Sequence, residues 1–138
     1  MGTEAPKADD LRDGEFLALF EEAKLDDFKH RSHVRMAWLI LRADGRDQGT
    51  QRILEDLRRY TVAYNAEAMF HHTLTVFWIH LVERALRRIP EVLDFEEFLA
   101  RNPPLLRSGL AFDYYSRERL MSDEARCGWV PPDLKPLP

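Results

Sequence analysis

The apolar residues of this chain recur every three or four positions, and no stretch alternates between apolar and polar residues with a period of two. Spacing of three to four residues places side chains on one face of an α-helix, whereas a half-buried strand requires alternation. The pattern therefore predicts an all-α fold and no β-sheet.

Four main helices are predicted from this periodicity, over residues 11–23, 28–41, 51–64 and 66–88. Asp94 and Glu97 form a capping-box pattern ahead of a short additional helix over residues 95–101. The end of the chain, VPPDLKPLP, cannot continue a helix because its prolines lack a backbone donor. We expect a four-helix bundle with a short additional helix and a proline-rich C-terminal strap.

A length of 138 residues is enough for one hydrophobic core, so we expect a disordered leader over residues 1–9 and a single helical domain over residues 10–138. The net charge of −4 argues against a nucleic-acid partner, and no apolar stretch is long enough to cross a membrane. The N-terminus lacks the pattern of a signal peptide, and a lone cysteine, Cys127, suits a reducing compartment. These features predict a cytoplasmic protein.

Three of the five histidines fall on the apolar stripes of predicted helices. His30 and His33 lie three residues apart in the second helix, and His71 lies in the fourth. His72 and His80 are expected to point outward to solvent. Because an imidazole is costly to bury without a partner, the three inward histidines are predicted to converge on one small polar pocket.

A shared metal ion is the most specific reason for such a cluster. Three neutral imidazoles bind zinc, iron, nickel or copper and leave a position open for water or substrate. Such a centre would activate water or oxygen, which makes a small-molecule metalloenzyme one hypothesis. The candidate proton donors are Tyr60 and Tyr64. The candidate pocket walls are Trp38, Thr75 and Trp78.

Two other interpretations of the histidines require no metal. In one, each imidazole donates to a tyrosine, a threonine or a backbone carbonyl, and the network holds the helices in register. In the other, the histidines orient a polar small-molecule ligand. The second function hypothesis is therefore a non-enzymatic module that binds a ligand or a partner protein. The sequence contains no HExxH, CxxC, P-loop or GxSxG motif that would identify a reaction.

The C-terminal strap carries the aromatic residues Tyr114, Tyr115 and Trp129 near its start. These aromatics predict that the strap packs on the bundle, covering the end where His30 and His71 lie. A strap in this position either closes the end of the bundle or acts as a lid over the histidine pocket. A third interpretation is a proline-rich ligand for another protein, although the segment lacks a PxxP motif with a flanking basic residue.

Two motifs, HxxHVRMAWL and HHTLTVFW, together with YYS and VPPDLKPLP, resemble a group of small bacterial helical proteins without an assigned activity. The resemblance covers most of the chain from Phe28 onward and implies a helical fold and a bacterial source. In architecture the chain is also similar to DinB/YfiT-type four-helix bundles, which hold a metal ion with three histidines. Those proteins take one histidine from the second helix and two, spaced HxxxH, from the fourth, whereas this chain offers two and one.

Overall fold

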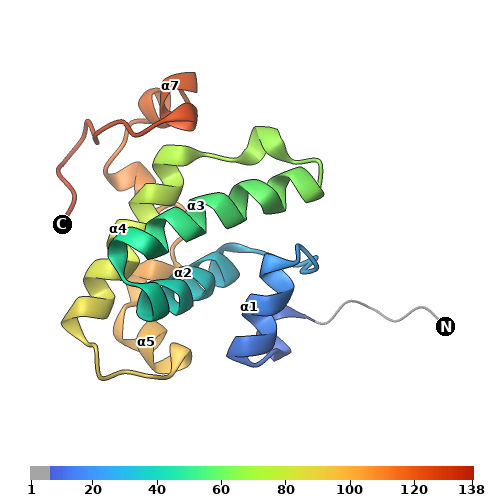
Figure 1. The fold of residues 1–138 in the computed structure, drawn as a ribbon. Helices are drawn as coiled ribbons and strands as arrows, with labels where there is room; N and C mark the ends of the chain where they lie inside the picture. The colour runs from blue at the N-terminus through green and yellow to red at the C-terminus, as the bar shows by residue number, and fades with distance from the viewer. Residues whose placement is uncertain (1–6) are drawn as a thin grey trace.

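The computed structural model describes residues 7–138, which fold into helices joined by short connections and contain no strand (Figure 1). The prediction of an all-α fold is confirmed. The α-helices of the described residues are α1 (Asp13–Glu21), α2 (His30–Asp44), α3 (Arg46–Ala63), α4 (His72–Arg88), α5 (Phe95–Arg101), α6 (Arg117–Leu120) and α7 (Asp123–Cys127). The 3-10 helices are η1 (Ala8–Asp10), η2 (Glu67–Met69), η3 (Pro103–Leu106) and η4 (Leu110–Asp113).

Ordered structure begins closer to the N-terminus than predicted. Residues 1–6 of the expected leader lie outside the described residues, but Ala8 is 1% exposed and starts η1. The backbone N–H of Ala8 donates to the carboxylate of Asp27 at 3.1 Å. This contact fixes the chain ahead of α1, so the folded part includes residues 8 and 9.

Helices α2, α3 and α4 pack against one another in pairs, and α1 lies against α2 and α3 (Figure 1). Together α1 to α4 correspond to the four predicted main helices, with shifted boundaries. Their finer description as a four-helix bundle stays a prediction. The core side chains of these helices include Phe16, Phe20, Val34, Ala37, Trp38, Ile40, Leu41, Ile53, Leu57, Phe77, Leu81 and Val82.

The connection between α2 and α3 is shorter than expected. The predicted helices over residues 28–41 and 51–64 leave the polar segment DGRDQGT between them, but α3 begins at Arg46 and only Gly45 separates it from α2. Gly45 makes this corner with φ +80°, a conformation that residues with a Cβ rarely adopt. Gly49 lets the helices approach closely, because a Cβ there would lie 3.0 Å from Cδ2 of Leu41.

Helix α4 begins six residues later than the predicted start at residue 66. Asn65, with φ +53°, ends the segment that contains α3, and η2 occupies part of the connection. His71 has an extended backbone and precedes the first residue of α4, so it lies outside the helix on whose stripe it was predicted. The helix ends at Arg88, close before Pro90, as the proline predicts.

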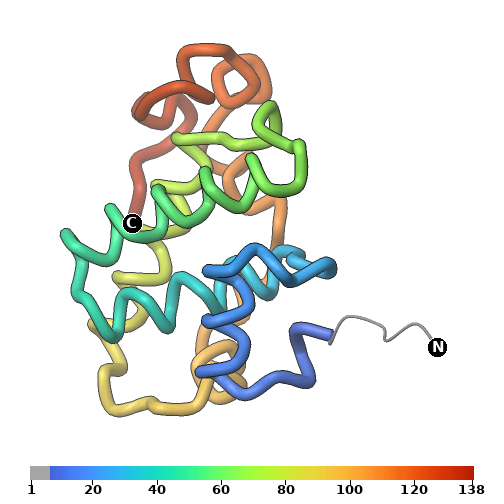
Figure 2. The backbone as a smooth tube through the Cα atoms, turned by 45° about the vertical axis from the view of Figure 1, so that its right-hand side comes forward, coloured from blue at the N-terminus to red at the C-terminus, as the bar shows by residue number. Residues whose placement is uncertain are grey.

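Helix α5 has the predicted bounds, and Asp94 caps it by accepting the N–H of Glu97 at 3.0 Å. Ser116 and Ser122 cap α6 and α7 in the same way. Helix α7 packs on α4, and residues 128–138, here called the C-terminal segment, return from α7 towards the middle of the molecule (Figure 2).

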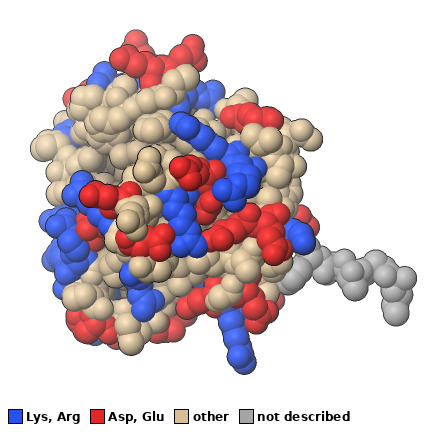
Figure 3. Space-filling view, viewed as in Figure 1, with Lys and Arg blue, Asp and Glu red and all other residues tan. Residues whose placement is uncertain are grey.

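Ion pairs between charged side chains connect the outer faces of the helices. Arg52 of α3 forms ion pairs with Glu21 of α1 and, at 3.1 Å, with Asp44 of α2. Acidic and basic side chains are interspersed on the face that Figure 3 shows. None of the described helices combines the length and the apolar character that a membrane crossing requires.

Candidate ligand-binding cavity

A cavity of about 460 Å³ lies between α2, α3 and α4. Its floor is apolar and consists of the buried side chains of Met36, Ala37, Ile53, Leu57 and Ile79. Its rim includes the exposed residues Met69 and Ser108, so the cavity opens to solvent on that side. The remaining lining residues are Phe28, His30, His33, Tyr60, Thr61, Ala66, Phe70, His71, Leu74, Thr75 and Trp78.

The three histidines predicted to converge all line this cavity. His30, the first residue of α2, lies 2.7 Å through Nε2 from the carbonyl oxygen of Leu105. Because a carbonyl only accepts, Nε2 of His30 carries a proton, and in the neutral imidazole Nδ1 is then a bare acceptor. The ring stands edge-on to Trp78, with ring centroids 4.5 Å apart. His30 therefore connects α2 with η3, and its Nδ1 has no hydrogen-bond partner among the described residues.

His33 has the opposite tautomer. Its Nδ1 donates to the carbonyl oxygen of Lys29 at 2.9 Å, which leaves Nε2 as the bare acceptor. Burial lowers the pKa of His33 to about 4. The hydrogen bond that its ring donates to the carbonyl oxygen of Lys29 opposes this shift, and His30 adds a smaller lowering contribution. The imidazole is therefore neutral at pH 7. Phe28 packs against it with ring centroids 4.2 Å apart.

His71 uses both of its ring nitrogens. Nδ1 accepts the backbone N–H of Leu74 at 3.0 Å and so caps the start of α4. Nε2 donates to the carbonyl oxygen of Leu120, at the end of α6, at 2.6 Å. The neutral imidazole with its proton on Nε2 is the form that satisfies both contacts.

The donor set therefore does not fit a three-histidine metal centre. Among residues 7–138, no group of three or more His, Cys, Asp or Glu side chains is placed to hold a metal ion. A metal ligand needs a free lone pair, and the acceptor nitrogen of His71 is already occupied by the N–H of Leu74. The metal centre stays a prediction that this arrangement does not favour.

The two candidate proton donors lie in different places. Tyr60 lines the cavity, and its hydroxyl donates to the carbonyl oxygen of Leu25. Burial raises the pKa of Tyr60 well above its ordinary value, which weakens it as an acid. Tyr64 stacks on Tyr60, is 38% exposed, donates to Asp26 at 3.1 Å, and is not among the cavity lining.

Of the predicted walls, Thr75 and Trp78 line the cavity and Trp38 does not. Trp38 is fully buried on another side of α2, where it packs against Phe95 and Phe98 at centroid distances of 5.5 and 5.6 Å. The indole lies at this position because α5 covers that face of α2, a contact between segments distant in sequence.

The two histidines expected to face solvent are partly buried. His72 starts α4, and its Nδ1 is buried without a hydrogen-bond partner among the described residues. Burial, with the nearby Arg58, lowers the pKa of His72. The Nε2 of His80 lies 3.0 Å from the carbonyl oxygen of Pro138, so this ring contacts the C-terminal segment.

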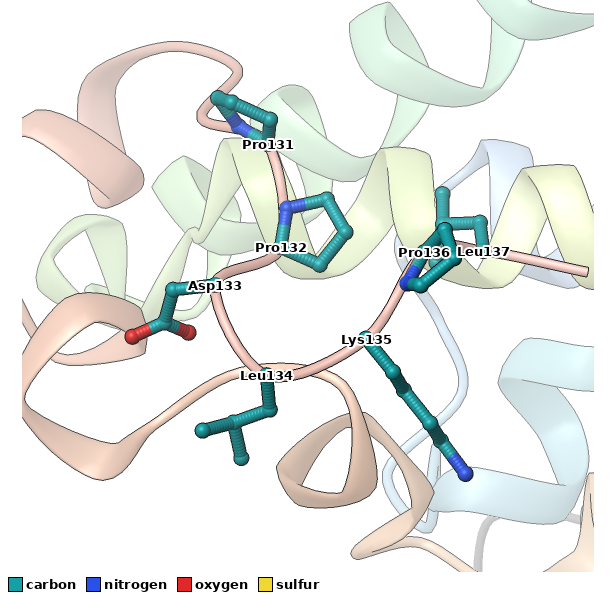
Figure 4. A pocket seen from close by; sticks show the side chains of 7 residues that line it. All are labelled: Pro131, Pro132, Asp133, Leu134, Lys135, Pro136 and Leu137. Atoms are coloured by element: carbon teal, nitrogen blue, oxygen red, sulfur yellow. The ribbon is translucent and has the colours of Figure 1, made fainter.

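The C-terminal segment is held against α4 outside the cavity. The hydroxyl of Thr73 donates to the carbonyl oxygen of Gly128 at 2.7 Å and accepts the N–H of Val130 at 3.1 Å. Thr73 lies two residues after His71, at the start of α4, and no residue of 128–138 lines the histidine cavity, so a strap over the histidine end of the bundle stays a prediction. It curves instead around a shallow depression of about 570 Å³ lined by its own residues 131–137 (Figure 4).

Several lining residues gave no signal in the sequence. Phe28, Ala66, Met69, Phe70 and Ser108 lie in connections rather than on helical stripes. The backbone carbonyls that fix the histidines also gave none, because every residue has one. No family model, curated protein or solved structure matches this chain.

Proposed function

We propose that this protein binds a small, mostly apolar molecule in the cavity between α2, α3 and α4. The main support for this proposal is the presence of the cavity. Protein interiors are packed as densely as organic crystals, and a void lined by apolar side chains lowers stability. A cavity of about 460 Å³ lies within the size range of small-molecule sites.

The chemistry of the lining favours binding over catalysis. Tyr60 donates to Leu25, His71 caps α4, and His30 holds the carbonyl of Leu105, so the polar groups have structural partners. A general base needs a nucleophile within hydrogen-bond reach, and no hydrogen bond joins two polar side chains of the lining. These contacts support the non-enzymatic hypothesis, in which the histidines also brace the fold.

Aromatic residues define the shape of the site. Phe28 packs on Tyr60 with ring centroids 5.0 Å apart, and Trp78 meets His30 at 4.5 Å. Aromatic rings interact favourably in stacked or edge-to-face arrangements. Walls of this kind suit a ligand with a planar ring.

The test is binding of N-phenylnaphthylamine, an uncharged fluorophore that brightens in apolar surroundings. Ala37 is 3% exposed and lines the cavity, so Ala37→Leu fills part of the void. We expect the wild type to bind the fluorophore and Ala37→Leu to raise Kd at least about tenfold. Ala43→Leu, the same change at an exposed position of α2, should leave Kd unchanged.

Ala37→Leu places its new methyl groups in the cavity, so we expect no fall in the melting temperature. A lower melting temperature would mean that the substitution has damaged the fold rather than filled the cavity. In that case, Leu57→Phe fills the same cavity from α3. The absence of binding by the wild type, or equal binding by all the variants, would overturn the proposal.

A further inference from the structure

We infer that the ligand of this cavity is uncharged and donates a hydrogen bond to the protein, because the polar side chains that lie inside the rim, where the exposed Ser108 is found, offer acceptors. This inference rests on the proposed function and specifies the ligand class of the same site. It follows from the hydrogen-bond directions of the polar side chains that line the cavity.

The first step concerns charge. The described residues that line the cavity include no Lys, Arg, Asp or Glu. A charged group taken out of water costs several kcal/mol unless an opposite charge or several hydrogen bonds compensate it. His33 is neutral at pH 7, since burial lowers its pKa to about 4. An anion or cation in this cavity would therefore lack a counter-charge among the lining residues, and the guanidinium found against the lining, that of Arg58, packs on the ring of Phe70.

The second step concerns the hydroxyl groups. Thr61 donates to the carbonyl oxygen of Arg58 at 2.8 Å, and Thr75 donates to that of His71 at 2.8 Å. Tyr60 likewise donates to the carbonyl oxygen of Leu25. Each hydroxyl has one proton, so all three oxygens have only lone pairs left to offer.

The third step concerns the imidazoles. The tautomers fixed by Leu105 and Lys29 leave Nδ1 of His30 and Nε2 of His33 as acceptors. Neither nitrogen is among the buried polar atoms without a partner, so both remain accessible from the cavity or from solvent. His71 offers no free acceptor, because both of its ring nitrogens already form hydrogen bonds.

Acceptors in the lining favour ligands that donate a hydrogen bond and also disfavour ligands that cannot donate one. A ligand with an O–H or N–H group satisfies one of these acceptors, whereas a ligand that only accepts would displace water and leave the acceptors unpaired. Sites built around a specific hydrogen bond reject analogues that lack it more strongly than apolar contacts alone can. The ligand class is thus an uncharged ring compound with a hydroxyl or N–H group, such as a phenol or an indole.

Three naphthalenes of similar size separate the parts of this inference. β-Naphthol is neutral at pH 7 and donates, β-fluoronaphthalene has nearly the same shape and does not donate, and β-naphthoate is an anion. Their affinities are measured by displacement of N-phenylnaphthylamine. We expect β-naphthol to bind about five- to tenfold more tightly than β-fluoronaphthalene, as one net hydrogen bond predicts, and β-naphthoate to bind most weakly.

Two variants locate the acceptor. His33→Leu should reduce the preference for β-naphthol over β-fluoronaphthalene to less than about twofold, because it removes one acceptor but keeps an apolar wall. Thr75→Val, which preserves the shape of the side chain, is the second variant and should reduce the preference if the hydroxyl oxygen is the acceptor. His80→Leu is the control, since His80 lies on α4 outside the cavity.

The outcomes distinguish this inference from the proposed function. Equal binding of β-naphthol and β-fluoronaphthalene overturns the donor requirement and leaves the binding function in place. Tightest binding of β-naphthoate overturns the uncharged class. A preference for β-naphthol that survives in both cavity variants overturns the assignment of His33 or Thr75 as the acceptor. Failure of all three compounds to displace the fluorophore overturns the proposed function as well.

Discussion

The ring of His71 donates to the carbonyl oxygen of Leu120 at 2.6 Å while its other nitrogen caps α4. A single neutral imidazole therefore connects the start of α4 with the end of α6. Because the same ring lines the cavity, one side of the binding site and the attachment of the C-terminal helices depend on the same side chain.

Replacing His71 separates its two roles. His71→Ala removes both contacts, so we expect the free energy of unfolding to fall by about 2 kcal/mol, roughly half from the cap and half from the bond to Leu120. Asparagine is a favourable N-cap residue, so His71→Asn should lose only about half as much. Urea unfolding of both variants measures the difference. Equal losses would mean that the cap contributes nothing.

Stability should depend on pH through His33. Burial lowers its pKa in the folded state to about 4, whereas its ordinary value, expected in the unfolded chain, is about 6.5. Between these values the unfolded chain binds more protons than the folded one. The free energy of unfolding should therefore be constant above about pH 6.5 and fall, by up to about 1.4 kcal/mol per unit, as the pH drops towards 4.

The comparison of wild type with His33→Leu isolates this contribution. Burial also lowers the pKa of His72, so His72 contributes to the pH dependence of the free energy of unfolding as well. The wild-type curve from urea unfolding should be the steeper of the two between pH 6.5 and 4. Parallel curves for the two proteins would contradict the buried, neutral state of His33.

Much of the fold followed from the sequence because it depends on local patterns. The apolar spacing located a buried stripe of α2, and Asp94 was recognisable as a cap. Gly45 was less predictable, because a one-residue corner depends on the close approach that Gly49 permits. The predicted start of α4 was wrong because His71 is not among the usual N-cap residues, so its capping role had no sequence signal.

The candidate site was predictable in part for a related reason. Helical spacing placed His30 and His33 on one side of α2, and both line the cavity. Their partners are the backbone carbonyls of Leu105 and Lys29, and only the folded chain brings Leu105 to His30. Sequence patterns identify side chains that need a partner, whereas the choice between a metal ion and a carbonyl is made by tertiary contacts.

The attachment of the C-terminal segment should depend on Thr73. This hydroxyl is fully buried and bonds to both Gly128 and Val130, and Tyr115 donates to the carbonyl oxygen of Val130 at 2.7 Å. Thr73→Val should lower the free energy of unfolding by about 2 kcal/mol, because it leaves a buried N–H and a carbonyl unpaired. Hydrogen exchange should show a faster-exchanging amide at Val130.

A double-mutant cycle with Tyr115→Phe tests whether the two side chains act on the same segment. Once Thr73→Val has loosened Val130, the second change should cost less than it does alone. Fluorophore binding should be unchanged in Thr73→Val, because no residue of 128–138 lines the cavity. Additive losses would mean that Thr73 and Tyr115 act independently.

Metal titration provides the sharpest test of the role of His71. Within residues 7–138, His30 and His33 each keep one ring nitrogen without a hydrogen-bond partner, whereas both ring nitrogens of His71 are bonded. Two imidazoles form a weaker site than three, so equimolar zinc or nickel should stabilise the wild type by less than about 1 kcal/mol. Any binding that occurs should be lost in His33→Leu and retained in His71→Asn. A stoichiometric metal in untagged protein that disappears equally in both variants would instead establish the three-histidine centre, since the nitrogen of His71 would then have to leave α4 to reach the ion.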